Sequence, residues 1–284
     1  MTPLPDQRRT WLITGASRGL GRAFAETALR AGDLVVATAR NPDTLEDLVD
    51  AYPDRALALA LDVADRKRAW EVTRQAKQAC GRIDVLVNNA GYLLFGAVEE
   101  VTEDEIRRQF DVNVYGAIWC TQAVLPVMRD QGGGHIFQIS SMGGIGPLMG
   151  TGMYSATKCA LEGFSESLAQ EVGPFGITVT IVEPGRFRTD ANGDSMMRAS
   201  PMAAYEDVLR ERREMISRTD ANLYPGDPRK AGEALLKALE SKPPPLRLLL
   251  GNAAAEAAPK IYRDRLSEWA RWESVTRATD FETP

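Results

Sequence analysis

From residue 11 onward, short apolar runs alternate with longer segments of helical period. This alternation is typical of β-α units, which build a parallel sheet. Several runs are apolar without interruption, as expected of strands that helices cover on both faces. We therefore expect a single α/β domain with a doubly wound parallel sheet and a core over about residues 10–251. The expected strands are Trp11–Thr14, Leu34–Ala39, Leu57–Leu61, Val85–Asn88, His135–Ser140, Thr178–Val182 and Leu246–Leu250.

Two segments depart from this alternation. Residues 190–226 follow an expected strand and contain one expected helix, Met202–Arg218, between polar stretches with methionines. Because ligands bind at the strand ends of such a sheet, we expect this insertion to act as a substrate lid. Residues 252–284 form a C-terminal helical extension, with Pro259 as a suitable helix start. This helix is expected to pack on the body or to form a dimer, burying one apolar face: Ile261, Leu266, Trp269, Trp272 and Val275.

The charge balance disfavours two classes of partner. The 284 residues carry a formal net charge of −5, and the basic run Arg210–Arg213 is interleaved with glutamate, as on a solvated helix face. Nucleic acid and anionic membranes are therefore not expected partners. Residues 1–9 contain no apolar signal core, and no stretch approaches the ~18 apolar residues of a membrane span. We expect a cytoplasmic protein.

The cysteines and the single histidine carry no chemical signature. Cys80, Cys120 and Cys159 are odd in number and lack a C-x-x-C spacing, which argues against a disulfide framework and against a zinc site. We expect three reduced, structural cysteines and no bound metal. His135 begins an expected strand and is interpreted as a structural hydrogen-bonding residue.

The first expected strand leads directly into a glycine-rich turn with G-x-x-x-G-x-G spacing, and helical spacing follows it. Glycines let the backbone approach a pyrophosphate at a helix N-terminus, where free N–H groups and the helix dipole favour negative charge. A turn of this kind also occurs for conformational reasons alone. At this position it predicts a dinucleotide site formed by Gly15, Ser17, Arg18, Gly19, Leu20 and Gly21.

The end of the second expected strand bears on the choice of dinucleotide. Folds that bind NAD(H) usually place an acidic residue there, about 20 residues beyond the glycine turn, on the ribose 2′-hydroxyl. This chain has Arg40 at that point and a second cation, Arg18, in the turn. Guanidinium groups suit a 2′-phosphate. The sequence therefore favours NADP(H). NAD(H) is the alternative if Arg40 is a solvated charge or if Asp43 replaces the usual acid.

Further motifs follow the glycine turn in one order: Asn88-Asn89-Ala90-Gly91, Asn113, Ser140-Ser141, Tyr154-Ser155-Ala156-Thr157-Lys158 and Pro184-Gly185. Together with the turn, they resemble the short-chain dehydrogenase/reductase family in its ordinary-length branch. The resemblance is close over about residues 10–190 and looser beyond. The segment Glu183–Thr189 is also similar to hydroxysteroid dehydrogenase relatives.

The resemblance implies a Rossmann-type sheet and an oxidoreductase with a catalytic tetrad. Its members are Asn113, Ser141, Tyr154 and Lys158, with Ser141 preferred to Ser140 because of its place after the strand end. It also implies further contacts to the cofactor, from Asp62 and Val63 at the adenine, from Asn89, Ala90 and Gly91 at the adenosine side, from Tyr154 and Lys158 at the reacting end, and from Pro184, Gly185 and Thr189 near the nicotinamide. Homodimers and homotetramers are common in the family.

The tetrad residue types suit proton transfer. Tyr154 and Lys158 lie four residues apart and share a helix face, so the ammonium group can approach the phenol. A tyrosine ordinarily titrates near pKa 10, and a nearby positive charge favours the phenolate. Tyr154 is then expected to protonate the alkoxide, while Ser141 holds the carbonyl oxygen. The resemblance implies that Lys158 binds the ribose hydroxyls and that Asn113 relays protons to it through a water.

The substrate is expected to be a hydrophobic ketone or aldehyde and its alcohol. This expectation rests on apolar candidate lining residues with adaptable methionines. The alternatives are an NAD-dependent alcohol dehydrogenase running oxidatively and, less favoured, a non-catalytic dinucleotide-binding regulator. The candidate lining residues are Leu93, Leu94, Phe95, Met142, Ile145, Leu148, Met149, Met153, Phe187, Met196 and Met197.

Overall fold

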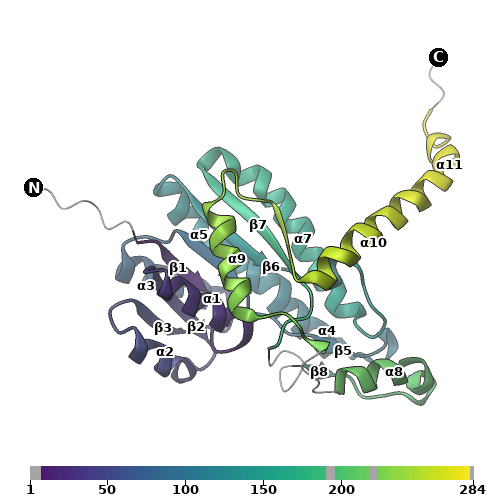
Figure 1. Ribbon diagram of the computed structural model, residues 1–284, viewed down its shortest axis with the longest axis horizontal. Helices are drawn as coiled ribbons and strands as arrows, with labels where there is room; N and C mark the ends of the chain where they lie inside the picture. Colours follow the sequence, from purple (N-terminus) through teal and green to yellow (C-terminus); the bar gives the residue numbers. More distant parts are fainter. Residues whose placement is uncertain (1–7, 190–195, 218–222, 282–284) are drawn as a thin grey trace, which may run out of the picture.

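The expected strands form one parallel sheet (Figure 1). The computed structural model describes residues 8–189, 196–217 and 223–281. Within them the sheet has seven strands in the order β3-β2-β1-β4-β6-β7-β9, and every pairing is parallel. The strand order reverses between β1 and β4, so this is the doubly wound, Rossmann-type sheet that was predicted. The strands are β1 Thr10–Ile13, β2 Leu34–Ala39, β3 Ala56–Ala60, β4 Val85–Asn88, β6 Gly134–Ile139, β7 Ile177–Pro184 and β9 Arg247–Leu250.

Side-chain alternation along the strands creates a core on each face of the sheet. Trp11 and Ile13 of β1 belong to one core, and Leu12 between them belongs to the other. Both faces are therefore covered by helices, which makes one three-layer domain (Figure 1). Helices α1 (Gly19–Arg30), α2 (Glu46–Ala51) and α9 (Pro228–Glu240) cover the first face, and α3 (Arg66–Cys80), α5 (Gly116–Asp130) and α7 (Gly152–Val172) cover the second.

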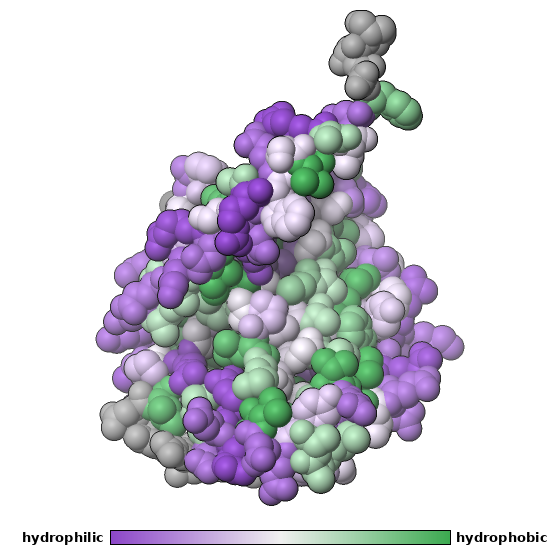
Figure 2. Space-filling view, turned by 90° about the vertical axis from the view of Figure 1, so that its right-hand side faces the viewer, coloured by the Kyte–Doolittle hydropathy of each residue, from purple (hydrophilic) through white to green (hydrophobic). Residues whose placement is uncertain are grey.

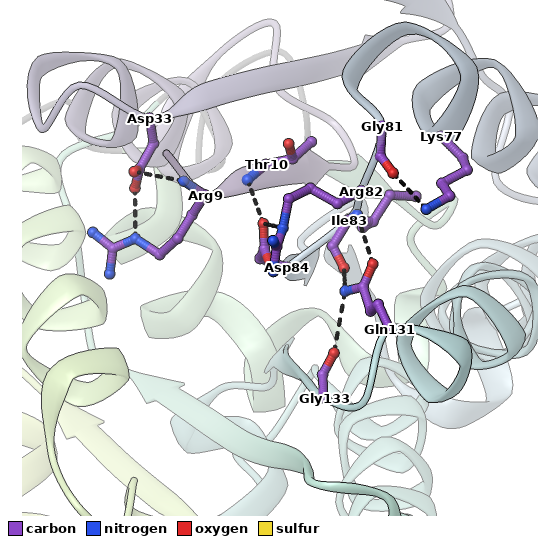
Figure 3. Close-up of polar contacts among 10 residues, drawn as sticks. All are labelled: Arg9, Thr10, Asp33, Lys77, Gly81, Arg82, Ile83, Asp84, Gln131 and Gly133. Carbon is purple, nitrogen blue, oxygen red and sulfur yellow. Dashed lines mark hydrogen bonds and ion pairs between the residues drawn. The ribbon is translucent and has the colours of Figure 1, made fainter. Parts of the chain in front are cut away.

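The amino-terminal edge of the sheet is held by its own polar contacts (Figure 3). The Arg9 side chain donates to Asp33 at 2.9 Å, and the backbone N–H of Thr10 donates to Asp84 at 2.8 Å. Gln131 hydrogen-bonds the backbone just before β4. These contacts fix the strands at the edge opposite to their carboxyl ends, where a ligand is expected.

Part of the predicted lid is ordered around a second, two-stranded sheet. Strand β5 (Leu94–Phe95) pairs in parallel with β8 (Met197–Arg198), and neither strand was predicted. Helix α8 (Glu206–Ser217) follows, where its Leu209 is buried with Phe95. The remainder of the expected lid, residues 190–195 and 218–222, lies outside the described residues. The other short elements are η1 (Pro42–Leu45), η2 (Val98–Glu100), α4 (Glu103–Phe110), η3 (Asp111–Tyr115), α6 (Met142–Ile145), η4 (Gly173–Phe175) and η6 (Ala203–Tyr205).

The basic run Arg210–Arg213 does not form the expected solvated face. Arg213 donates at 2.5 Å to Glu100, whose side chain is fully buried. The same Glu100 oxygen accepts the backbone N–H of Met202 at 2.9 Å, so it holds the segment before α8 as well. Arg212 faces a cavity at the carboxyl ends of the strands, which is described below. The local sequence pattern could not reveal this contact, because the partner of Arg213, Glu100, is 113 positions away along the chain.

The C-terminal extension is helical, but its apolar face is not buried within the chain. Helix α10 runs over Asn252–Arg271, so it starts before Pro259, and α11 follows over Glu273–Arg277. It projects from the body as an arm (Figure 1), above a face on which apolar patches lie among hydrophilic residues (Figure 2). Because its outer part extends beyond the body, four expected contacts are exposed: Leu266, Trp269, Trp272 and Val275. No membrane-spanning helix is found among the described residues.

All three cysteines are free thiols. Cys120 is buried, and burial raises the pKa of its thiol to about 12. Cys159 is exposed, although its thiol donates to the carbonyl of Gly144 at 3.2 Å. His135 is buried, and its Nδ1 pairs with the Thr178 hydroxyl at 2.7 Å, as suits a structural residue.

A buried ion cluster joins β9, β7 and α7. The Arg247 guanidinium contacts Glu162 at 3.0 Å, Glu166 at 2.8 Å, and Glu183. The side chains of Glu162 and Glu183 are nearly inaccessible to solvent. Burial and the neighbouring Glu162 raise the pKa of Glu183, against the opposing effect of Arg247. Arg247 therefore neutralises two acids that have little access to water, Glu162 and Glu183, and pairs with Glu166 nearer the surface.

We predict that Arg247→Met lowers the free energy of unfolding by about 3–5 kcal/mol at pH 7, because it leaves buried carboxylates unpaired. The loss should shrink as the pH falls. A carboxyl with a raised folded-state pKa binds protons more readily in the folded protein, so protonation favours folding. Urea unfolding at pH 7 and pH 5 measures both effects. Arg277→Met breaks an exposed ion pair with Glu273 and should cost under ~0.5 kcal/mol. Equal losses in the two variants would contradict the prediction.

Candidate active site

A cavity of about 1250 Å³ lies at the carboxyl ends of the strands. Its wall includes nearly all of the residues predicted to bind the cofactor or to act in catalysis. Of those residues, Gly21 and Asn113 do not line the cavity. The predicted residues that line it are Gly15, Ser17, Arg18, Gly19, Leu20, Arg40, Asp62, Val63, Asn89, Ala90, Gly91, Ser141, Tyr154, Lys158, Pro184, Gly185 and Thr189.

The glycine-rich turn is shaped to receive an anion. Gly15 and Gly19 have φ angles of +64° and +60°, which favour glycine. A side chain at Gly21 would put its Cβ 2.3 Å from the Gly15 carbonyl oxygen, so this glycine lets α1 pack against the turn. Helix α1 has no side-chain cap and no acidic residue in its first turn. Its first N–H groups and its dipole are therefore available to a phosphate.

Hydrogen bonds fasten this turn to the segment after β4. The Thr14 hydroxyl accepts the backbone N–H groups of Asn89 and Ala90 at 2.9 and 3.0 Å. The Asn89 amide donates in return to the carbonyls of Thr14 and Gly15 at 2.9 and 3.0 Å. Asn89 was predicted as a cofactor contact. In the structure its side chain holds the turn that borders the cavity.

Two arginines line the cavity near this turn. Arg18 and Arg40 are exposed, line the cavity, and have no side-chain partner among the described residues. Asp43, the alternative candidate, is absent from the described cavity wall. Its backbone N–H donates a hydrogen bond to the side-chain oxygen of Asn41, within the turn that follows β2. A cavity edge with two unpaired guanidinium groups fits a dinucleotide that bears an additional phosphate.

Three of the four side chains predicted for catalysis, Ser141, Tyr154 and Lys158, come together between the carboxyl end of β6 and the first turns of α7. Ser141 precedes the short helix α6, where its hydroxyl accepts the N–H of Gly143 at 3.0 Å, and it is hydrogen-bonded to Tyr154. Tyr154 lies in the first turn of α7. Ser140 points elsewhere, because its hydroxyl donates to buried Glu162 at 2.6 Å. The geometry therefore makes Ser141 the serine that can act with Tyr154.

Burial has the largest effect on the pKa of the Tyr154 phenol. Burial raises its pKa, and the hydrogen bond from Ser141 opposes this effect. The sequence had suggested that the Lys158 charge would favour the phenolate. In the structure the Lys158 Nζ lies 5.7 Å from the centre of the Tyr154 ring. The phenol is therefore protonated at neutral pH, as a proton donor to a substrate should be.

Lys158 is itself buried. Its ammonium group donates to the carbonyl of Ile139 at 2.7 Å. Burial lowers its pKa from 10.5 to about 8, although nearby Glu162 favours the charged form. Among the described residues, the carbonyl of Ile139 is the acceptor that this buried ammonium group contacts. The ammonium group is consequently well placed to bind polar groups of a ligand.

Asn113 supports the site from behind. It lies in η3, a π-helical turn between α4 and α5 that the sequence did not predict. Its amide accepts the N–H of Tyr92 at 3.0 Å and donates to the carbonyl of Tyr92 and the hydroxyl of Thr157 at 2.9 and 3.2 Å. It thus joins the segment after β4 to helix α7. Turns of this kind are frequent at functional sites.

The substrate side of the cavity is only partly as expected. Leu93, Phe95, Met142, Leu148, Phe187, Met196 and Met197 line it. Leu94 and Ile145 are buried in the body, Met149 is exposed, and Met153 is also absent from the described wall. Sequence reasoning missed three wall arginines, Arg108, Arg186 and Arg212. The one signal for Arg212 is its helical spacing with Met215 and Ile216, which share its face of α8.

Comparison with known proteins identifies the family. Residues 9–199 match the family model described as short chain dehydrogenase. The protein called oxidoreductase BOA17, from Botryotinia fuckeliana, is 40% identical over 95% of this chain and 99% of its own length. The structure of a short-chain dehydrogenase from Streptomyces avermitilis has a TM-score of 0.91 and 45% identity, covering 97% of this chain and 100% of that one.

A more distant solved relative bears on the cofactor. It is an alcohol dehydrogenase from the archaeon Thermococcus sibiricus complexed with 5-hydroxy-NADP, with 25% identity and a TM-score of 0.69 over 86% of this chain and 96% of that one. Together with the anion-ready turn, it supports a nicotinamide dinucleotide as the cofactor. The chain is an oxidoreductase that belongs to the short-chain dehydrogenase/reductase family.

Proposed function

We propose that this protein uses NADPH to reduce an apolar ketone or aldehyde to its alcohol, reversibly. One observation carries the proposal: Ser141, Tyr154 and Lys158 lie on the wall of the same cavity as the uncapped start of α1. The raised pKa of Tyr154 keeps its phenol protonated, and a protonated phenol can give its proton to a developing alkoxide. The apolar wall residues support a hydrophobic substrate.

The proton-transfer step follows from the positions of the side chains. A bound NADPH supplies the hydride that reaches the carbonyl carbon. Ser141 donates a hydrogen bond to the carbonyl oxygen and keeps it beside Tyr154. Tyr154 transfers its phenolic proton to that oxygen as negative charge develops there. The positive charge of Lys158 stabilises the phenolate that remains.

Other residues hold the reactants and exclude water. The start of α1 and the glycine turn would hold the pyrophosphate, and Arg18 and Arg40 the 2′-phosphate. Asp62, Val63 and the segment 89–91 would contact the adenosine part, while Lys158, Pro184, Gly185 and Thr189 would contact the nicotinamide end. Asn113 is a positioning residue for α7. The described part of the insertion, with β8 and α8, would cover the substrate as a lid.

One alternative activity keeps the same residues. An NAD-dependent alcohol dehydrogenase would run the reaction oxidatively, with Tyr154 as the base. Arg40 on the cavity wall, with no side-chain partner among the described residues, favours the NADP-dependent assignment over it. A non-catalytic dinucleotide-binding regulator is disfavoured because Ser141, Tyr154 and Lys158 are all present at the cavity wall.

We predict that Tyr154→Phe lowers kcat by at least about 100-fold, since positioned acid–base groups contribute roughly 10²–10⁴. The change removes only the phenolic oxygen, so the unfolding midpoint and NADPH affinity should stay close to wild type. Steady-state rates on a panel of apolar carbonyls, together with NADPH calorimetry, measure these effects. Retention of more than about a tenth of the wild-type kcat, a barrier change under ~1.4 kcal/mol, would remove Tyr154 from the proposed role.

We predict that NADPH is preferred to NADH by at least about tenfold. Arg40→Asp should shrink or reverse this preference, because it replaces a phosphate partner by a repelling carboxylate. The ratio of kcat/KM for the two cofactors is the measurement. Asp43→Asn is the matched control for the rival acidic residue and should leave the ratio unchanged. A ratio that responds to Asp43→Asn and not to Arg40→Asp would reverse the assignment.

We predict that Lys158→Met abolishes turnover yet raises the free energy of unfolding at pH 7 by about 1–3 kcal/mol, because it removes a desolvated charge. The folded-state pKa of about 8 lies below the ordinary 10.5, so the unfolded chain holds the proton over a wider pH range. Wild-type stability should therefore rise between these values, and the advantage of the variant should vanish near pH 10.5. Urea unfolding across this range tests it, and a less stable variant at pH 7 contradicts it.

A further inference from the structure

Two arginines on the substrate side of the cavity lack an acidic partner in the part of the chain that the structure describes. Arg186 and Arg212 each direct an Nη atom to the sulfur of Met215, at 3.6 and 3.8 Å. A thioether is only a weak acceptor. The Nε of Arg212 is buried and has no hydrogen-bond partner among the described residues. The two guanidinium groups are thus close together, and among the described residues neither has a stronger acceptor than this sulfur.

The neighbouring arginines of α8 do have acidic partners, so the lack of one is specific to the helix face that carries Arg212. Arg210 forms an ion pair with Asp207, and Arg213 forms one with buried Glu100. Arg212 instead shares the cavity wall with Met215 and Ile216, at helical spacings of three and four residues. The docking of α8 through Glu100 and Leu209 therefore turns one specific guanidinium toward the cavity.

The backbone beneath Arg186 is also fixed. The N–H of Gly226 donates to the carbonyl of Arg186 at 3.0 Å, and the N–H of Arg188 donates to the carbonyl of Gly226 at 2.9 Å. This pairing joins the end of β7 to the segment before α9. Both arginines consequently extend from restrained backbone, which reduces the entropy lost when a ligand binds.

The electrostatics of the pair favour an anion. Burial and the charge of Arg186 lower the pKa of Arg212, and Tyr224 on the same wall opposes this effect. Two like charges therefore face one cavity at a mutual electrostatic cost. An oxyanion between them would relieve the repulsion and satisfy the unpaired N–H donors.

We propose that the substrate carries an anionic oxygen group, a carboxylate or a phosphate, that Arg186 and Arg212 bind at a point separate from the reacting carbonyl. This rests on the proposed function for the place of the carbonyl at Tyr154. The phosphates of the dinucleotide have their own candidate partners, at the start of α1 and at Arg18 and Arg40. The apolar wall residues Leu93 and Leu223 suit the hydrocarbon part, so the substrate is an amphiphile.

Binding of simple amphiphiles tests the proposal without turnover. The enzyme saturated with NADP⁺, or with NAD⁺ if that is the preferred cofactor, is titrated in a calorimeter with decanoate, decyl phosphate and neutral decanamide. At least one anion should bind about tenfold or more tightly than decanamide, as charge-assisted hydrogen bonds predict. The tighter of the two anions distinguishes carboxylate from phosphate as the natural group.

Matched variants locate the binding. Arg212→Gln and Arg186→Gln should each reduce the affinity for the anion toward that of decanamide. Arg210→Gln, on the same helix but paired at the surface, should leave it unchanged. Three results would each overturn the proposal: equal binding of anions and amide by the wild type, an equal loss in Arg210→Gln, or a comparable loss of dinucleotide affinity in Arg212→Gln.

The same measurements separate this proposal from the proposed function. Tyr154→Phe should bind the anion as the wild type does, because the phenol takes no part in anion binding. If no carbonyl is reduced but the anion still binds through Arg186 and Arg212, only the reductase assignment fails. If carbonyls are reduced but the anions bind no more tightly than decanamide, only the anion-site proposal fails.

Discussion

The hydrogen bonds that join Thr14 to Asn89 and Ala90 are the interaction on which the rest of the site depends. They connect the ends of β1 and β4 at the point where the strand order reverses. Each strand there leads into a helix on a different face of the sheet, so the two segments diverge and leave a cavity between them. The turn that starts α1 forms one side of the opening, and the segments after β4 and β6 form the other.

The sheet was predictable because local patterns specify it, and uninterrupted apolar runs predicted the strands to within a few residues. The candidate residues Ser141, Tyr154 and Lys158 came instead from the resemblance of several ordered motifs to one family, and the structure places all three on one cavity wall. The partnership of Arg213 with Glu100, and the pairing of β5 with β8, connect positions roughly a hundred residues apart. Nothing in local periodicity encodes such contacts. The exposure of α10 escaped prediction for another reason, since an apolar stripe indicates that a face prefers burial but not what covers it.

The polar groups proposed to carry out the chemistry also cost the fold stability, because they are buried. Lys158 and Tyr154 sit in surroundings that disfavour their charged forms, and Glu162 links Lys158 electrostatically to the Arg247 cluster. The cluster and the site thus share one carboxylate environment on the same side of α7. A change at the sheet edge can therefore reach the proton-transfer residues through charge alone, without displacing them.

The projecting C-terminal arm gives the protein separate optical reporters. Of five tryptophans, Trp11 is 1% exposed and stacks on Phe137 inside the sheet, whereas Trp269 and Trp272 on the arm are 67% and 59% exposed. A water-soluble collisional quencher will extinguish the red-shifted fluorescence of the arm, and that of Trp70, which is 43% exposed, long before it reaches the blue-shifted emission of Trp11. Anything that covers the arm will shift the emission of Trp269 and Trp272 to shorter wavelengths while the emission of Trp11 stays constant.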